Sequence, residues 1–145
     1  MKILLIGNGA REHCIAEALR RNKETEVYSY LKSKNPGIIS LSEVFKLGNY
    51  NDMNKIKSYA QKIKPDFAFI GSEEPLSNGV VDLLNEIGIG SVGPTKELAQ
   101  LESSKSFTRN LLKKYKIKGN PKFENFNKNN INEAKKFLDG IEKCV

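Results

Sequence analysis

The chain has 145 residues, which is long enough for one domain with a substantial hydrophobic core but short for two. Hydrophobic residues make up 39% and charged residues 28%, a balance that excludes an intrinsically disordered chain. The net charge of +7 comes mostly from lysines spread between apolar positions, without interleaved aromatic residues, so we expect a solvated lysine-covered surface and no nucleic-acid partner.

Neither a membrane segment nor a secretory signal is expected. No apolar stretch approaches the ~18 residues of a membrane helix, and the first apolar run, Ile3–Ile6, is too short for a signal peptide. The two cysteines, Cys14 and Cys144, lack the spacing of metal ligands. We therefore expect reduced thiols and a cytoplasmic location, with no membrane partner.

Short apolar runs alternate with segments of helical periodicity over the first two thirds of the chain. Strands are expected at 2–6, 27–31, 44–47, 67–70 and 89–92, and helices after Gly9, over 53–63 and over 76–87. A turn is expected at 35–37. This rhythm predicts an α/β fold with a doubly wound, mostly parallel, five-stranded Rossmann-like sheet. Right-handed crossovers would then place the loop after each strand at one ligand-binding edge.

The character of the sequence changes after Pro94. Helices are expected over 96–102, 105–115 and 131–138, a strand is possible at 122–126, and 143–145 resemble the start of another strand. We therefore divide the chain into a first domain, 1–95, and the start of a second portion, 96–145.

The most informative segment is Gly7-Asn8-Gly9-Ala10-Arg11-Glu12-His13, between the first strand and the first helix. Two glycines allow a tight turn whose N–H groups, together with the helix N-terminus, face an anion such as phosphate. The next three side chains offer a phosphate clamp, an acceptor for hydroxyls or amines, and a titratable donor. Purely structural roles stay open: the glycines only make the turn, Glu12 caps the helix, and His13 packs.

A second candidate loop, Gly71-Ser72-Glu73-Glu74-Pro75-Leu76, follows the fourth strand and falls at the same predicted edge. A carboxylate there can accept hydrogen bonds from sugar hydroxyls or from a substrate amine. We favour Glu73 for this role, because Glu74 precedes proline and fits a solvated residue at a helix start.

Two other functions fit the glycine turn. One is an NADP-binding Rossmann domain of an oxidoreductase, in which Lys32 and Lys34 would meet the extra phosphate. Against it, Glu12 replaces the third glycine of the dinucleotide motif, and no acidic residue ends the second strand. The other is a non-catalytic interaction module whose glycine turn is only structural.

Four motifs together resemble one family. They are Gly7 to His13, Gly71 to Leu76, Gly93-Pro94-Thr95, and Gln100-Leu101-Glu102-Ser103-Ser104-Lys105-Ser106-Phe107. In this order and spacing they resemble the N-terminal portion of the phosphoribosylamine–glycine ligase (glycinamide ribonucleotide synthetase) family, which are ATP-grasp enzymes of purine biosynthesis. The chain departs from the family pattern at Ser72, where proline is usual, at Ser103, where glycine is usual, and after Gly37.

The resemblance implies an activity. ATP, with Mg²⁺ or Mn²⁺, would phosphorylate the carboxylate of glycine, and the amine of 5-phosphoribosylamine would attack the acyl phosphate to give glycinamide ribonucleotide, ADP and phosphate. It implies that Gly7, Asn8, Gly9, Arg11, Glu12, His13, Gly71 and Glu73 bind the phosphoribosylamine, and that Lys105 contacts ATP.

The family continues beyond residue 145 into the second ATP lysine, a glycine-rich flap and the acidic metal ligands. The resemblance therefore implies a fragment: a substrate-side pre-ATP-grasp domain and the opening helices of a truncated ATP-grasp domain, whose remainder would be its partner. We expect the 145 residues alone to be inactive and to hold no metal.

Overall fold

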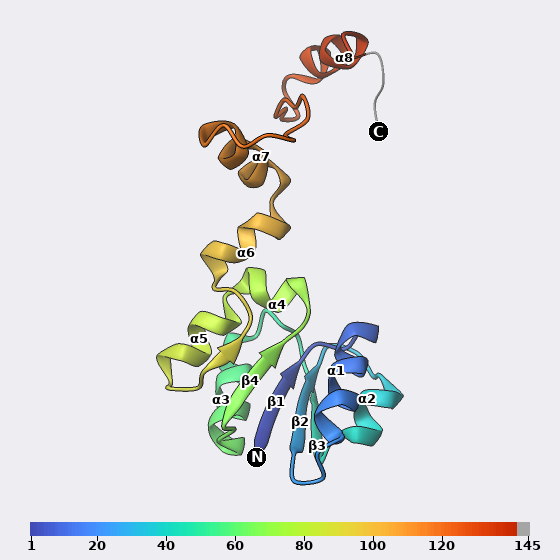
Figure 1. The fold of residues 1–145 in the computed structure, drawn as a ribbon, viewed down its shortest axis with the longest axis vertical. Helices are drawn as coiled ribbons and strands as arrows, with labels where there is room; N and C mark the ends of the chain where they lie inside the picture. Colours follow the sequence, from blue (N-terminus) through green and yellow to red (C-terminus); the bar gives the residue numbers. More distant parts are fainter. Residues whose placement is uncertain (142–145) are drawn as a thin grey trace. The chain divides into compact units, whose positions relative to one another are not determined.

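The structure, a computed structural model, describes residues 1–141 of the chain (Figure 1). These residues belong to two units, Met1–Ser103 and a second unit that begins at Ser104, and each is described by itself. The expected strand start at 143–145 and Cys144 lie outside the described residues. Cys14 is a free, exposed thiol.

The first unit alternates strands with helices along the chain. Its strands are β1 (Lys2–Ile6), β2 (Glu26–Leu31), β3 (Val44–Leu47), β4 (Phe67–Ile70) and β5 (Ser91–Val92). Its helices are α1 (Ala10–Arg20), α2 (Pro36–Leu41), α3 (Met53–Ile63), α4 (Glu73–Asn78), α5 (Val80–Glu86) and α6 (Lys96–Ser103). The predicted α/β class is confirmed.

The predicted five-stranded, doubly wound sheet is confirmed, and all five strands are parallel. Their order in the sheet is β3-β2-β1-β4-β5. The register is level at the carboxyl edge, because Ile6 of β1 lies opposite Tyr30 of β2 and opposite Ile70 of β4. The loops after these three strands therefore begin side by side. From β1 the chain adds β2 and β3 on one side of the sheet and then β4 and β5 on the other. The switch point of the sheet therefore lies between β1 and β4.

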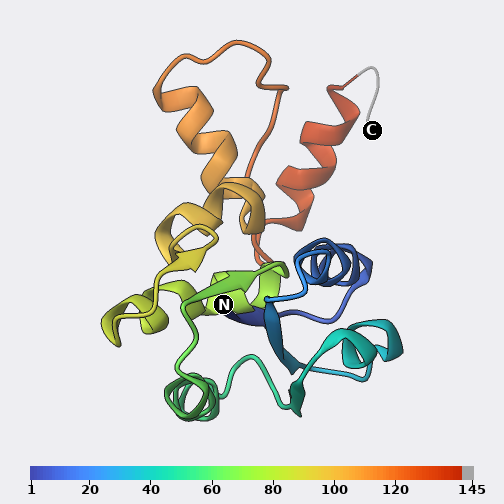
Figure 2. The ribbon, with the colours of Figure 1, turned by 60° about the horizontal axis from the view of Figure 1, so that its bottom comes forward.

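Alternate residues of the central strand β1 face two separate cores. Leu4 and Ile6 pack into a core that includes residues of α3 and α5, whereas Leu5 packs against residues of α1 and α2 on the opposite face. Figure 2 shows α1 and α2 on one side of the strands and α3 on the other. A strand covered on both faces explains why the sequence of β1 is an uninterrupted apolar run.

Some predicted elements have different bounds. The helix expected over 76–87 is two helices, because Gly79 adopts the left-handed region (φ 87°), ends α4 and begins α5. The turn expected at 35–37 begins α2, with Asn35 as N-cap and proline at the first helical position. The fifth strand is also shorter than expected, since only Ser91 and Val92 pair with β4.

Over residues 104–141 the second unit forms two helices, α7 (Lys105–Lys114) and α8 (Ile131–Asp139). The side chain of Ser104 caps α7 by accepting from the amide of Phe107 at 3.3 Å, and the rings of Phe126 and Phe137 lie 5.6 Å apart. The strand expected at 122–126 is wrong: these residues are described and form no strand. No ladder partner is formed for them among the described residues, and an isolated strand is not stable.

Candidate functional site at the carboxyl edge of the sheet

The loop after β1 turns sharply enough to begin a helix within three residues. Gly7 is buried and has φ of +137°, a conformation that side-chain-bearing residues rarely adopt. A Cβ at this position would also lie 2.5 Å from Cγ of Glu12 and 2.7 Å from Oγ of Ser72. The glycine is therefore required by both backbone conformation and space, and the turn leaves α1 with its N-terminus at the carboxyl edge of the sheet.

Glu12 holds this turn from within. Its side chain is almost completely buried (3% exposed), and its Oε2 accepts a hydrogen bond from the amide of Gly9 at 2.6 Å and one from Oγ of Ser72 at 3.2 Å. This satisfies the orphan donor of the N-cap residue and ties the loop after β1 to the loop after β4. A carboxylate also supplies charge of the favourable sign for a helix N-terminus.

Arg11 connects the same two loops from the solvent side. Its guanidinium donates to the carbonyl oxygen of Gly71 at 3.1 Å, and its side chain is otherwise exposed. The two loops enclose an open hollow of about 330 Å³. It is lined by Gly9, Ala10, Arg11, Glu12, Gly71, Ser72 and Glu73. The hollow lies between the loops after β1 and β4, at the switch point where open parallel sheets bind ligands.

The hollow is lined by the cationic side chain of Arg11 and by the anionic side chains of Glu12 and Glu73. The N–H groups of Ala10 and Arg11, in the first turn of α1, have no acceptor within the helix and give its N-terminus a partial positive charge. Glu73 is exposed at the opposite wall, whereas the Glu12 carboxylate is occupied by the two donors of the protein. This set of groups fits a ligand that carries an anion at one end and hydroxyl or amine donors at the other.

Three predicted residues do not line this hollow, and one of them is Gly7, which is buried within the turn. The ring of His13 is turned toward α2, where a Cβ on Gly37 would overlap it, and its Nε2 lies 3.5 Å from Oε1 of Glu17. Asn8 is half-buried, and its side chain hydrogen-bonds Ser33 and Tyr50. The structure thus brings five predicted residues around one hollow, and not Gly7, Asn8 or His13. The five are Gly9, Arg11, Glu12, Gly71 and Glu73.

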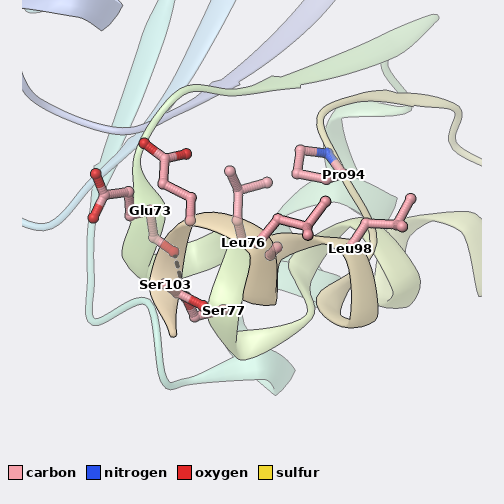
Figure 3. Close-up of a pocket in the computed structure, with 9 residues that line it drawn as sticks. Glu73, Leu76, Ser77, Pro94, Leu98 and Ser103 are labelled. Carbon is pink, nitrogen blue, oxygen red and sulfur yellow. Dashed lines mark hydrogen bonds between the residues drawn. The ribbon is translucent and has the colours of Figure 1, made fainter. Parts of the chain in front are cut away.

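Glu73 also borders a second pocket of about 350 Å³ between α4 and α6 (Figure 3). Leu76, Pro94 and Leu98 give this pocket a largely apolar wall. In Figure 3 Glu73 lies at one end and Leu98 and Pro94 at the other. Because the first turn of α4 contributes to both hollows, a ligand near Glu73 has polar surroundings on one side and apolar surroundings on the other.

Several residues that shape the site were not predicted. Ser72 lies in a predicted loop but was given no role there, and it hydrogen-bonds Glu12. Lys32 and Glu74 form an ion pair at 2.6 Å that joins the loop after β2 to the first turn of α4. Tyr50 contacts Asn8 from the loop before α3, and burial raises the pKa of its hydroxyl to about 12. For Ser72, Lys32 and Glu74, the sequence indicated only that they follow predicted strands and so lie near the ligand-binding edge. For Tyr50 it gave no such indication.

Lys105 lies in the second unit, at the first position of α7. It is exposed and borders a hollow of about 440 Å³. Lys105, Ser106, Arg109, Phe123, Glu124, Asn125 and Phe126 line it. Two cations beside two aromatic rings fit an anionic ligand with a flat apolar part. Among residues 1–141, no three His, Cys, Asp or Glu side chains are grouped so that they could hold a metal ion.

The fold and the hollow define a parallel α/β domain of the doubly wound class, with an anion-compatible turn at its switch point. A match to the family described as Phosphoribosylglycinamide synthetase, N domain, covers residues 1–102, and the chain belongs to this family. Helices within the described part of the chain all fall short of the length and apolar character required to traverse a bilayer.

Individual relatives agree with this assignment. A phosphoribosylamine–glycine ligase of Methanococcus vannielii is 53% identical over 148 residues, which cover 100% of this chain and 33% of that protein. One of Methanocaldococcus jannaschii is 52% identical over 141 residues, covering 97% of this chain and 32% of that protein. The chain therefore spans about a third of the length of these relatives.

Solved structures show the same fold. Phosphoribosylglycinamide synthetase from Anaerococcus prevotii superimposes with a TM-score of 0.67 at 14% identity, covering 98% of this chain and 35% of that one. N5-carboxyaminoimidazole synthetase from Staphylococcus aureus, complexed with ADP, gives 0.72 at 19% identity, covering 94% of this chain and 36% of that one. The alternative of an NADP-binding oxidoreductase domain is not supported by these relatives, and Lys32 is engaged by Glu74.

Proposed function

We propose that the chain is the substrate-side part of a phosphoribosylamine–glycine ligase and that its hollow binds 5-phosphoribosylamine. The observation that carries this proposal is that Gly9–Glu12 and Gly71–Glu73, parts of two motifs expected to contact that substrate, line one open hollow. It is supported by the family to which residues 1–102 belong and by relatives named for this activity.

Each group of the hollow has a distinct role in this proposal. The N–H groups at the start of α1 and the guanidinium of Arg11 bind the 5-phosphate, because both offer donors and positive charge. Glu73 accepts hydrogen bonds from the ribose hydroxyls or the amine. Glu12 acts through the turn, since its carboxylate is already bonded to Gly9 and Ser72. His13 does not line this hollow, so this proposal gives it no contact with the substrate.

The reaction proposed for the longer protein has two steps. A terminal oxygen of the glycine carboxylate attacks the γ-phosphorus of ATP, releasing ADP and forming glycyl phosphate. The amine of 5-phosphoribosylamine then attacks the activated carbonyl carbon, loses a proton and expels inorganic phosphate, leaving the new amide bond of glycinamide ribonucleotide. Orientation of the amine by this hollow would convert the second step into a reaction between positioned groups.

The second unit would contribute to nucleotide binding. Lys105 and Arg109, on neighbouring turns of α7, present positive charge to the hollow lined by Phe123 and Phe126, which fits the phosphates of ATP. A divalent metal, when bound with the nucleotide, would neutralise phosphate charge. The described residues offer no carboxylate cluster for it, so its ligands would come from elsewhere in the longer protein. A cytoplasmic location, small-molecule substrates and the remainder of the ATP-grasp domain as its partner complete the proposal.

Titration with ribose 5-phosphate tests the substrate assignment. In a ¹⁵N-labelled sample of the 145-residue chain, we expect chemical-shift changes at 9–12 and 71–73, larger than those caused by inorganic phosphate. Changes elsewhere only, or no saturable change, would contradict the proposed site. Separately, the chain given ATP, Mg²⁺, glycine and 5-phosphoribosylamine should release no ADP above background, and turnover would show that no further part of the enzyme is required.

A further inference from the structure

The buried hydroxyl of Tyr50 reaches the glycine turn from a distant part of the chain. Tyr50 lies just before α3 and is 2% exposed. Its hydroxyl donates to Oδ1 of Asn8 at 2.7 Å and accepts from the backbone N–H of Lys32 at 3.2 Å. One buried oxygen thus joins the loops after β1 and β2, which lie on the two neighbouring strands at the centre of the sheet.

Asn8 is held by further contacts on its other polar groups. Its side-chain nitrogen donates to Oγ of Ser33 at 3.0 Å, and its carbonyl oxygen accepts from Nδ2 of Asn35 at 3.0 Å. With Tyr50 on Oδ1, the side-chain oxygen, side-chain nitrogen and carbonyl of Asn8 all have partners within the chain. A residue so engaged is suited to fix the backbone of the turn rather than to bind a ligand directly.

Tyr50 is itself fixed from the opposite side. The side-chain amide of Asn78, at the end of α4, donates to the carbonyl of Tyr50 at 3.2 Å and to Oδ1 of Asn51 at 2.7 Å. The tyrosine ring lies 6.4 Å from that of Tyr30 within the core. The position of its hydroxyl is therefore determined by packing against Tyr30 of β2 and by the hydrogen bond from Asn78 of α4, neither of which belongs to the turn.

We propose that Tyr50 is a positioning residue for ligand binding: its hydroxyl orients Asn8 and thereby sets the turn so that the N–H groups that follow it face the hollow. The functional part of this inference rests on the function proposed above. The hydroxyl holds the Asn8 amide in one orientation by donating to its Oδ1 at 2.7 Å. Burial raises the pKa of this hydroxyl to about 12, so it stays a donor well above neutral pH.

Tyr59 offers a matched control in the same core. It is also buried (7% exposed), packs on Tyr30 with ring centroids 5.9 Å apart, and has a pKa raised to about 12 by burial. Its hydroxyl, however, donates to the carbonyl of Val44 at 3.2 Å and does not reach the turn. Tyr50→Phe and Tyr59→Phe therefore remove the same atom from similar surroundings, and only the first removes a contact with Asn8.

The experiment compares the two variants of the 145-residue chain with the parent. Tyr50→Phe should weaken ribose 5-phosphate binding by about 5- to 10-fold, the effect of one hydrogen bond, whereas Tyr59→Phe should change it less than about 2-fold. The amide of Gly9 should also exchange with solvent faster in Tyr50→Phe alone, in the absence of any ligand. Thermal melting of both variants accounts for any general loss of stability.

The outcomes separate the two proposals. Equal Gly9 exchange in the two variants overturns the positioning role, whatever the ligand does. Faster exchange with unchanged affinity also overturns it, because the turn would then move without consequence for binding. If the parent chain does not bind ribose 5-phosphate, the proposed function fails together with the functional part of this inference, and the exchange comparison still decides whether Tyr50 sets the turn.

Discussion

The carboxylate of Glu12 and the amide of Gly9 form a 2.6 Å hydrogen bond inside the first turn of α1. The same carboxylate accepts from Ser72, so a single buried side chain connects two loops separated by 60 residues. Glu12 was expected to bind substrate, but its carboxylate already accepts hydrogen bonds from Gly9 and Ser72 and so stabilises the turn. The turn that would face a phosphate is stabilised by an acidic side chain on its protein side, which leaves the remaining N–H groups of the helix start available.

Glu12→Ala should lower the free energy of unfolding by about 2–3 kcal/mol, because a buried amide and a hydroxyl lose a charged acceptor. Glu12→Gln keeps an acceptor oxygen and should cost about 1 kcal/mol. Urea unfolding followed by circular dichroism measures both values. Glu17→Ala is the control, since its side chain on the same helix is 59% exposed and should change stability by less than about 0.5 kcal/mol. Equal losses at the two positions would contradict the role assigned to Glu12.

Alanine substitutions at three glycines allow two contributions to the free energy of unfolding to be separated: backbone strain at positive φ, and steric overlap of the new Cβ. Gly7 has positive φ and no room for a Cβ, Gly88 has positive φ (+78°) with nothing within 4 Å, and Gly90 has neither constraint. Alanine should therefore cost more than about 2 kcal/mol at Gly7, about 1 kcal/mol at Gly88 and less than about 0.5 kcal/mol at Gly90. Denaturant midpoints of the three variants check this order, and a Gly7 variant as stable as Gly90→Ala would contradict the tight turn.

The central strand β1 was predictable from sequence because it is buried on both faces, whereas the edge strand β3 is exposed. The run at β1 and the run at β4 are apolar and end in glycine, so their bounds, 2–6 and 67–70, are those predicted. Helix breaks were less visible. The apolar spacing from Leu76 to Ile87 continues through Gly79, and only the left-handed conformation of that residue separates α4 from α5.

The candidate site was predictable only in part, because the sequence indicates which loops meet but not which side chains face the hollow. The glycine turn and the loop with Glu73 follow neighbouring parallel strands, so topology alone brings them together. Whether a side chain faces the hollow depends on contacts that sequence spacing does not reveal. His13 is one residue beyond Glu12 and therefore about 100° around α1, which turns it toward Gly37 and away from the hollow. Tyr50 carries no motif and was not predicted.

Buried tyrosines should make stability fall at high pH, and Tyr50 and Tyr59 are the two with the largest rise in pKa. Burial raises the pKa of Tyr50 and of Tyr59 from 10.0 to about 12. Between pH 10 and 12 the unfolded chain therefore loses protons that the folded chain keeps, so the stabilisation present below pH 10 is lost as pH rises through this window. Each tyrosine contributes a slope of at most about 1.4 kcal/mol per pH unit.

Urea unfolding at intervals from pH 8 to pH 12 measures this dependence. The variant with both Tyr50→Phe and Tyr59→Phe should show a shallower decline above pH 10 than the parent. Its free energy of unfolding at pH 8 provides the reference, so that the loss of the two hydroxyls is separated from their ionisation. Parallel curves for the parent and the double variant would show that other groups cause the decline.

Arg11 and Arg20 give the sharpest test of anion binding in the hollow. Both lie on α1 and both donate to a backbone carbonyl, Arg11 to Gly71 at 3.1 Å and Arg20 to Thr25 at 2.6 Å. Only Arg11 borders the hollow, since Arg20 lies in the last turn of the helix. Arg11→Ala should weaken ribose 5-phosphate binding by about 10-fold or more, because a charge-assisted contact with the phosphate is lost. Arg20→Ala removes the same charge from the molecule and should leave the dissociation constant within about 2-fold, because a charge more than a Debye length away is screened.

Isothermal titration at constant ionic strength measures both constants. Similar losses in the two variants would mean that the +7 net charge attracts the ligand without a defined site, and the phosphate assignment would then be abandoned.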